Sequence, residues 1–274
     1  GFLFLFGWCA YRVFVKSDGP ASAVAAAICA LILPLSAHSL DAALADLPYC
    51  AFLWLACLLA QGAQFPFFPW RILALGLVGA ACFASRMAAI PLLPAAGMVL
   101  LLRPRHEKLP WAVVLVIWTA TAYYVMFAQP GAEVLGGESV GRTFPRMVTD
   151  AFENLKVIAI AAGSVLPLTT PWLRLTQGLQ GVALLAAAAG IMLSLLPRIA
   201  TTATQGLLAR LRAISFVEWT MFWTVAMLAA LPVRDARYAW ALLPFVAAGM
   251  TRAFAWTVNR YLNLPPRIAQ HADT

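Results

Sequence analysis

A succession of apolar segments with short connections is the feature that most constrains this fold. About nine segments can be delimited, at residues 1–11, 21–37, 47–61, 72–85, 87–102, 110–128, 178–196, 213–231 and 238–256. A hydrocarbon layer about 30 Å thick is crossed by roughly 20 helical residues. With 63% of the residues hydrophobic and 11% charged, the apolar surface exceeds what a soluble domain buries. Only helices and closed barrels satisfy the backbone in lipid, so the sequence predicts one all-α, polytopic membrane domain over residues 1–274.

The basic residues indicate how these segments are oriented. The net charge is +8, but Lys and Arg lie at segment ends instead of forming a stripe, which argues against nucleic-acid binding. When alternate loops are assigned to opposite sides, twelve basic residues fall on one side and seven on the other. The richer side and the carboxy terminus are therefore expected to be cytoplasmic. Seven of the eleven acidic residues fall on the outer side, where carboxylate chemistry is expected.

The stretch from Arg71 to Arg105 places one charge between two apolar runs. Its sequence predicts a helical hairpin, with Arg86 at the tip and with Pro91 and Pro94 interrupting the first turns of the second arm. A cation in hydrocarbon costs about 2.5–3.5 kcal/mol even on the lenient insertion scale. Arg86 should therefore face a polar cavity or an anion, unless its long side chain reaches the interface.

An outward turn, SAHSLDAALADLPY, brings His38, Asp41 and Asp46 together before a span. Asp46 precedes Leu47-Pro48, which favours a helix cap for the span beginning at Leu47. The alternative is that Asp46 or Asp41 positions a sugar hydroxyl or a proton.

A late stretch, LPVRDARYAWALLPF, places Arg234, Arg237 and Tyr238 at the outer mouth of the last span. Arginines at an outer interface run against the positive-inside tendency. A phosphate is a natural partner, because a guanidinium offers a fork of donors. Asp235 provides an internal partner for one of the two arginines but not for both.

The longest connection, residues 129–177, is predicted to lie on the outer side. Within it, residues 144–160 form an amphipathic pattern with a capping Thr143 and with Pro145 in the first turn. The pattern predicts a helix on the outer membrane surface, which either roofs a cavity or connects two spans.

Two further groups of residues are interpreted as structural. Glu218 lies inside an apolar segment, where Arg210 and Arg212 at the cytoplasmic rim offer it partners. The five cysteines lie in apolar runs without a CxxC pair, so they are expected to be small buried hydrophobes rather than metal ligands.

Three stretches resemble the bacterial GT-C superfamily of integral-membrane glycosyltransferases, which includes protein mannosyltransferases and aminoarabinose transferases. LPLSAHSLDAALADLPYCAFLWLACLLA resembles the family's outward turn with an acid before a span. LALGLVGAACFASRMAAIPLLPAAGMVLLLRPR is similar to its hairpin with a basic residue and a proline-bearing helix, and RYAWALLPFVAAG to its late Arg-Tyr…Pro span. The order and sidedness of the three carry the resemblance.

The resemblance implies inverting transfer of a sugar from a polyprenyl-phosphate donor to a glycan, lipid or protein acceptor, on the outer face of a bacterial inner membrane. Arg86 and Arg237 would stabilise the phosphate leaving group, which needs positive charge rather than an acid. Arg234, Tyr238 and His38 would complete the substrate site. No cofactor beyond the lipid-linked donor is implied, no metal ligands are assigned, and the sugar, the acceptor and any divalent metal stay open.

The family's general base is a carboxylate on the first outward loop. Because this chain opens in an apolar run at Gly1, we expect one span and that loop to precede it, which leaves Asp41 and Asp46 as secondary members of the site. The alternative function is a secondary transporter or lipid flippase. Such a protein would need paired halves and charges near the midplane, which the sequence lacks.

Overall fold

A computed structural model describes residues 1–36, 40–61, 69–127, 206–230 and 240–261. Every regular element in these ranges is helical, which confirms the all-α class for this part of the chain. The elements are α1 (Phe2–Ser17), α2 (Pro20–Ser36), α3 (Leu40–Gln61), α4 (Pro69–Ser85), the 3₁₀ helix η1 (Met87–Ala89), α5 (Leu92–Leu102), α6 (Arg105–Phe127), α9 (Leu207–Ala213), α10 (Phe216–Ala230) and α11 (Leu243–Tyr261). The expected segment at 178–196, the surface helix at 144–160 and the whole of the loop 129–177 lie outside the described residues.

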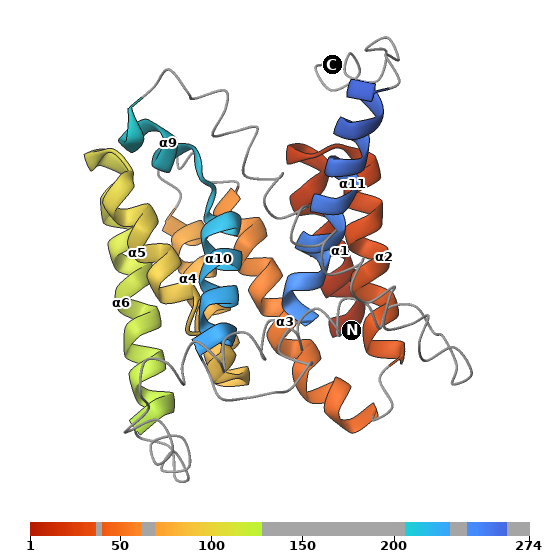
Figure 1. Cartoon of the computed structure of the whole chain (residues 1–274). Coiled ribbons are helices and arrows are strands. Elements are labelled where there is room, and N and C mark those ends of the chain that lie inside the picture. The colour runs from red at the N-terminus through yellow and green to blue at the C-terminus, as the bar shows by residue number, and fades with distance from the viewer. Residues whose placement is uncertain (37–39, 62–68, 128–205, 231–239, 262–274) are drawn as a thin grey trace.

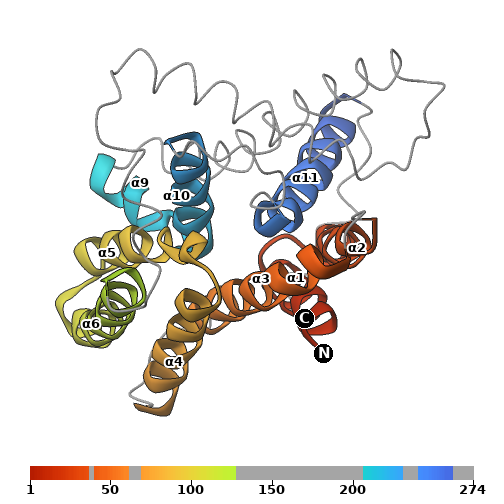
Figure 2. The same ribbon diagram turned by 90° about the horizontal axis from the view of Figure 1, so that it is seen from below.

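The long helices lie side by side as a bundle, with α3 near its middle (Figures 1 and 2). One side of α3 packs against α1, which in turn packs against α2, while α11 lies along α2. The other side of α3 packs against α4, and α10 contacts both α3 and α5. The carboxy-terminal ends of α1, α3 and α5 lie at one end of the bundle and those of α2, α4 and α6 at the other (Figure 1). Consecutive helices from α1 to α6 therefore run in alternating directions, and the side of the membrane that each end faces stays a prediction.

The first turn of the bundle shows how local sequence sets the direction of the chain. Buried residues recur along α1 at helical spacing, and the helix ends at Ser17. Gly19 then adopts a positive φ of 84°, which a side chain would disfavour. Pro20 follows as the first residue of α2, where its missing N–H would have no helical partner. This turn therefore reverses the chain within two residues and holds Asp18 at the end of the bundle.

The expected hairpin around Arg86 is only partly correct. The two arms exist as α4 and α5, joined through η1, and the second arm becomes α-helical only after Pro91. The arms do not form a tightly packed pair, because α6 packs extensively against both of them. Two small residues on α4, Gly76 and Gly79, allow α6 this close approach.

Helix length tests part of the membrane prediction. Among the described residues, only α6 is long and apolar enough to cross a bilayer, over Glu107–Val125 with a mean hydropathy of 1.3. Shorter apolar helical stretches occupy Pro20–Leu31, Asp46–Gln61, Trp70–Ser85 and Leu92–Leu102. The expectation that the chain crosses the membrane about nine times therefore stays a prediction. The cysteines follow the prediction more closely, since all five are free thiols and Cys29 alone is not fully buried.

Candidate functional site

An ion pair joins two residues that the sequence singled out separately. A guanidinium nitrogen of Arg86 lies 2.6 Å from Oδ1 of Asp46, and only 5% of the aspartate side chain is exposed. Arg86 follows the last turn of α4, while Asp46 lies in the amino-terminal third of α3. The anion expected opposite Arg86 is therefore a residue of the same chain. The arginine side chain keeps 27% of its surface exposed, so it still borders the outside of the bundle.

The predicted capping role of Asp46 is wrong. The helix begins at Leu40 and runs through Asp46 and Pro48 without interruption. The run Asp41-Ala-Ala-Leu-Ala has enough helix propensity to start the helix before the proline. Pro48 removes one backbone N–H inside α3, but it does not end the helix. Asp46 therefore projects from a helix side and is available to Arg86.

Two further bonds hold the Arg86 segment against α3. The hydroxyl of Tyr49 donates to the carbonyl of Ala88 at 3.1 Å, and the thiol of Cys82 donates to the carbonyl of Tyr49 at 3.7 Å. Tyr49 and Cys82 are fully enclosed. Because these bonds bracket Arg86 on both sides, the ion pair lies within a fixed frame rather than on a free loop.

A third bond connects α3 to the segment before α11. The indole Nε1 of Trp54 donates to the carbonyl of Ala241 at 2.9 Å, and both residues are buried. Asp46, Tyr49 and Trp54 are spaced at three to five residues along one helix. Thus α3 fixes both the Arg86 segment and the start of the last described helix.

The ion pair limits what each partner can do chemically. A carboxylate that faces a guanidinium is stabilised in its charged form, so it is a poor proton acceptor. A guanidinium held by a buried carboxylate is fixed in orientation. The geometry therefore suits Asp46 as a positioning residue for Arg86 better than as a general base.

The other predicted site residues lie wholly or in part outside the described residues. Asp41 lies in the first turn of α3, but its side chain is outside the described residues, as are His38, Arg234, Arg237 and Tyr238. The structure therefore brings together Asp46 and Arg86 and leaves the remaining residues as predictions. Tyr49 and Trp54, which connect α3 to the Arg86 segment and to the segment before α11, were not singled out from the sequence. Their only sequence signal is a polar atom on a large side chain within an apolar run.

Glu218 has the structural role expected of it, but with a different partner. Its Oε2 accepts a hydrogen bond from the backbone N–H of Ser215 at 2.7 Å, and its own backbone N–H donates to the hydroxyl of Ser215 at 3.3 Å. This reciprocal arrangement is a capping box for α10. Arg212 instead donates through Nε to the carbonyl of Leu102. The Ser-x-x-Glu spacing would have revealed this role in the sequence.

Within the ranges that the structure describes, no group of three or more His, Cys, Asp and Glu residues is arranged to hold a metal ion. Comparisons with protein-family models, with curated proteins and with solved structures find no match to this chain.

Proposed function

We propose that this chain is a polytopic membrane glycosyltransferase that moves a sugar from a polyprenyl-phosphate donor to an acceptor at the outer face of a bacterial inner membrane. The proposal combines the sequence resemblance to the GT-C superfamily with the arrangement of its three stretches around α3.

The surface of the bundle supports the membrane component of this proposal. Large apolar side chains are exposed at helical spacing, on α4 at Trp70, Leu73 and Leu77, and on α6 at Leu109, Val113 and Val116. Contiguous exposed apolar faces of this kind mark contact with lipid or with a partner protein. The opposite face of α6 packs into the core through Trp111, Val114 and Trp118. A helix that is apolar on both faces is typical of a membrane span.

The single observation that carries the functional component is the convergence of the three stretches on α3. The first stretch supplies Asp46, Tyr49 and Trp54 from α3 itself. The second supplies Arg86 and Ala88, and the third supplies Ala241. These stretches are separated by up to about two hundred residues in sequence, so a shared location is not a consequence of chain proximity. Segments expected to share one active site are therefore in contact where they are described.

The chemistry assigns separate roles to the charged residues. Arg86, oriented by Asp46, and Arg237 would face the phosphate of the lipid carrier and stabilise charge as the sugar–phosphate bond breaks. A carboxylate from another outward segment would remove the proton of the acceptor hydroxyl. Attack on the face opposite the phosphate then inverts the anomeric carbon.

The test is a transfer assay with the full-length protein in proteoliposomes. A labelled polyprenyl-phosphate sugar is supplied with bacterial envelope lipids and glycans as acceptors, and the labelled product and its anomeric configuration are determined. The wild-type protein is expected to form an inverted product. Arg237→Ala is expected to abolish transfer and to insert into membranes normally.

Arg105→Ala provides a matched control, since Arg105 is an exposed arginine at the opposite end of the bundle. This control is expected to retain wild-type transfer. Normal turnover by Arg237→Ala would contradict the proposed site. Solute or lipid movement across the bilayer without any covalent product would favour the transporter or flippase alternative.

A further inference from the structure

A cavity of about 250 Å³ opens at the end of the bundle opposite the Asp46–Arg86 pair. It lies between the turn after α1, the end of α3, the start of α10 and the middle of α11. Its apolar wall consists of Phe14, Val217 and Phe245, all of which are buried. The phenyl rings of Phe14 and Phe245 contact each other, with centroids 6.3 Å apart.

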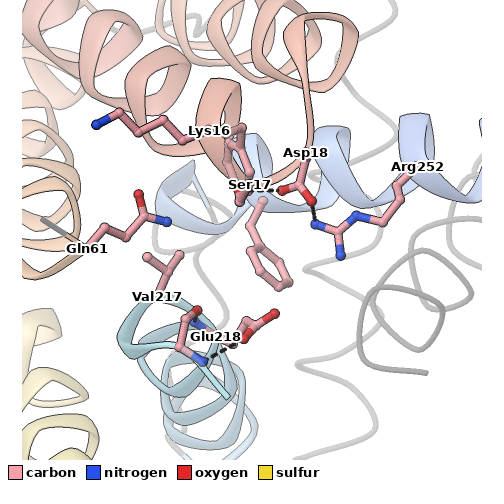
Figure 3. A pocket seen from close by; sticks show the side chains of 10 residues that line it. Lys16, Ser17, Asp18, Gln61, Val217, Glu218 and Arg252 are labelled. Atoms are coloured by element: carbon pink, nitrogen blue, oxygen red, sulfur yellow. Dashed lines mark hydrogen bonds and ion pairs between the residues drawn. The ribbon is translucent and has the colours of Figure 1, made fainter. Parts of the chain in front are cut away.

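Four charged side chains line the cavity, two of each sign. Asp18 and Arg252 form an ion pair, and Ser17 donates a hydrogen bond to the same carboxylate. Glu218 holds the capping box of α10, and Lys16 lies at the rim (Figure 3). The net formal charge of the lining is therefore zero, although both signs are present.

The polar groups of the rim are accessible from outside. Lys16 and Gln61 are exposed, and neither has a hydrogen bond or an ion pair among the residues that the structure describes. Figure 3 shows them on one side of the cavity, across from the Asp18–Arg252 pair, with Glu218 below. A ligand between them would meet an ammonium, a guanidinium, an amide and carboxylates within one small space.

This lining discriminates among ligand charges. A free anion would approach the carboxylates of Asp18 and Glu218 at short range, and a simple cation would approach Lys16 and Arg252. A zwitterion can place its negative group near the cations and its positive group near the carboxylates. The cavity, at about 250 Å³, is somewhat smaller than typical ligand pockets of about 300–1,000 Å³, so a compact group fits better than a complete lipid-linked sugar.

We propose that this cavity binds the zwitterionic phosphoethanolamine group, in which a phosphate is joined through two carbons to a primary ammonium. Lys16 and Arg252 bind the phosphate, while Glu218 and the amide oxygen of Gln61 receive the ammonium. The group is supplied by an ethanolamine phospholipid of the surrounding bilayer or by a free phosphoethanolamine compound. This site depends on the proposed membrane location but not on sugar transfer.

The test measures binding to the full-length protein in detergent. Thermal stability and native mass spectra are recorded with dioleoyl-phosphatidylethanolamine, with dioleoyl-phosphatidylglycerol and with O-phosphoethanolamine. Phosphatidylethanolamine is expected to bind and to raise the Tm, whereas anionic phosphatidylglycerol is not. If O-phosphoethanolamine raises the Tm as well, the headgroup alone is sufficient and the ligand can be soluble; if it does not, the lipid is the ligand.

Lys16→Ala and Gln61→Ala are the informative variants, because each removes an exposed rim group and leaves the Asp18–Arg252 pair intact. Lys16→Ala is expected to weaken binding by about tenfold, as loss of a charge-assisted hydrogen bond does. Lys108→Ala removes a lysine at the same end of the bundle outside the cavity and is the matched control. Equal binding by Lys16→Ala and Lys108→Ala, or equal stabilisation by both lipids, would overturn the proposal. Sugar transfer by Lys16→Ala is expected to be normal, so failure of this site is distinguishable from failure of the proposed function.

Discussion

The contact between α4 and α6 predicts a large penalty for a single added methyl group. A Cβ built at Gly79 would lie 2.0 Å from Nε1 of Trp118 and 2.2 Å from its Cε2. The indole is fully buried and cannot swing into solvent. Its N–H also donates to the carbonyls of Leu75 and Gly76, at 3.3 and 3.1 Å. Gly79→Ala must therefore move a ring that is held by packing and by hydrogen bonds.

The magnitude follows from these two contributions. Overpacking a filled interface costs about 1–3 kcal/mol, and displacement of the indole N–H loses about 1 kcal/mol of hydrogen bonding. The helix propensity gained by replacing glycine with alanine returns less than about 1 kcal/mol. Gly79→Ala is therefore expected to lower the free energy of unfolding by about 1–3 kcal/mol.

Gly97→Ala on α5 is the matched control, because a Cβ there meets nothing within 4 Å. Both variants are compared with the wild type by SDS-induced unfolding in mixed micelles. The control is expected to be neutral or up to about 1 kcal/mol more stable. If Gly79→Ala unfolds at the same SDS fraction as Gly97→Ala, the close contact between Gly79 on α4 and Trp118 on α6 is contradicted.

Two further predictions concern the contacts of α3. Asp46→Asn and Arg86→Gln are each expected to lower the free energy of unfolding by about 2–4 kcal/mol, because each leaves the other charge without its ion-pair partner. In a double-mutant cycle, the double variant is expected to lose about 1–3 kcal/mol less than the sum of the two single variants. Strict additivity of the two losses would refute the ion pair. Trp54→Phe keeps an aromatic ring but removes the hydrogen bond to the carbonyl of Ala241. It is expected to lower the free energy of unfolding by about 1–3 kcal/mol in the same assay. Wild-type stability of this variant would refute the Trp54–Ala241 hydrogen bond.

The helical architecture was predictable because apolar segments and their charged ends are visible in sequence. Helices α1 to α6, α10 and α11 overlap, in order, the segments assigned by hydrophobicity. Their packing partners were not predictable. The hairpin interpretation treated α4 and α5 as neighbours because they are adjacent in sequence, whereas α4 packs against α3 and α6, and Gly76 and Gly79 allow the close approach of α6. Which helices pack together is therefore determined less by their order in the sequence than by where small residues allow close contact.

In the candidate site, the importance of Asp46 and Arg86 was predictable from the sequence, but their pairing and the contribution of Tyr49 were not. Asp46 and Arg86 were each expected on the outer side, and a buried charge of either sign needs a partner. The need of each buried charge for a partner would have predicted the Asp46–Arg86 pair. Asp46 was instead interpreted as a helix cap, because it precedes Leu47-Pro48. The Asp18–Arg252 pair had no such signal, since it joins residues over two hundred positions apart and depends on how α11 lies along α2.

The proposed site requires Arg86 and Arg237 to converge on one phosphate group, and a distance measurement tests this requirement most directly. Spin labels are attached at Ala84→Cys, an exposed position in the last turn of α4, and at Ala236→Cys, in a background where Cys29 is alanine and the remaining cysteines are buried. Pulsed electron–electron double resonance in nanodiscs is expected to give a distance between the two spin labels well below the ~30 Å thickness of the hydrocarbon layer. A separation of about 30 Å or more would place the two arginines on different headgroups and contradict the proposed site.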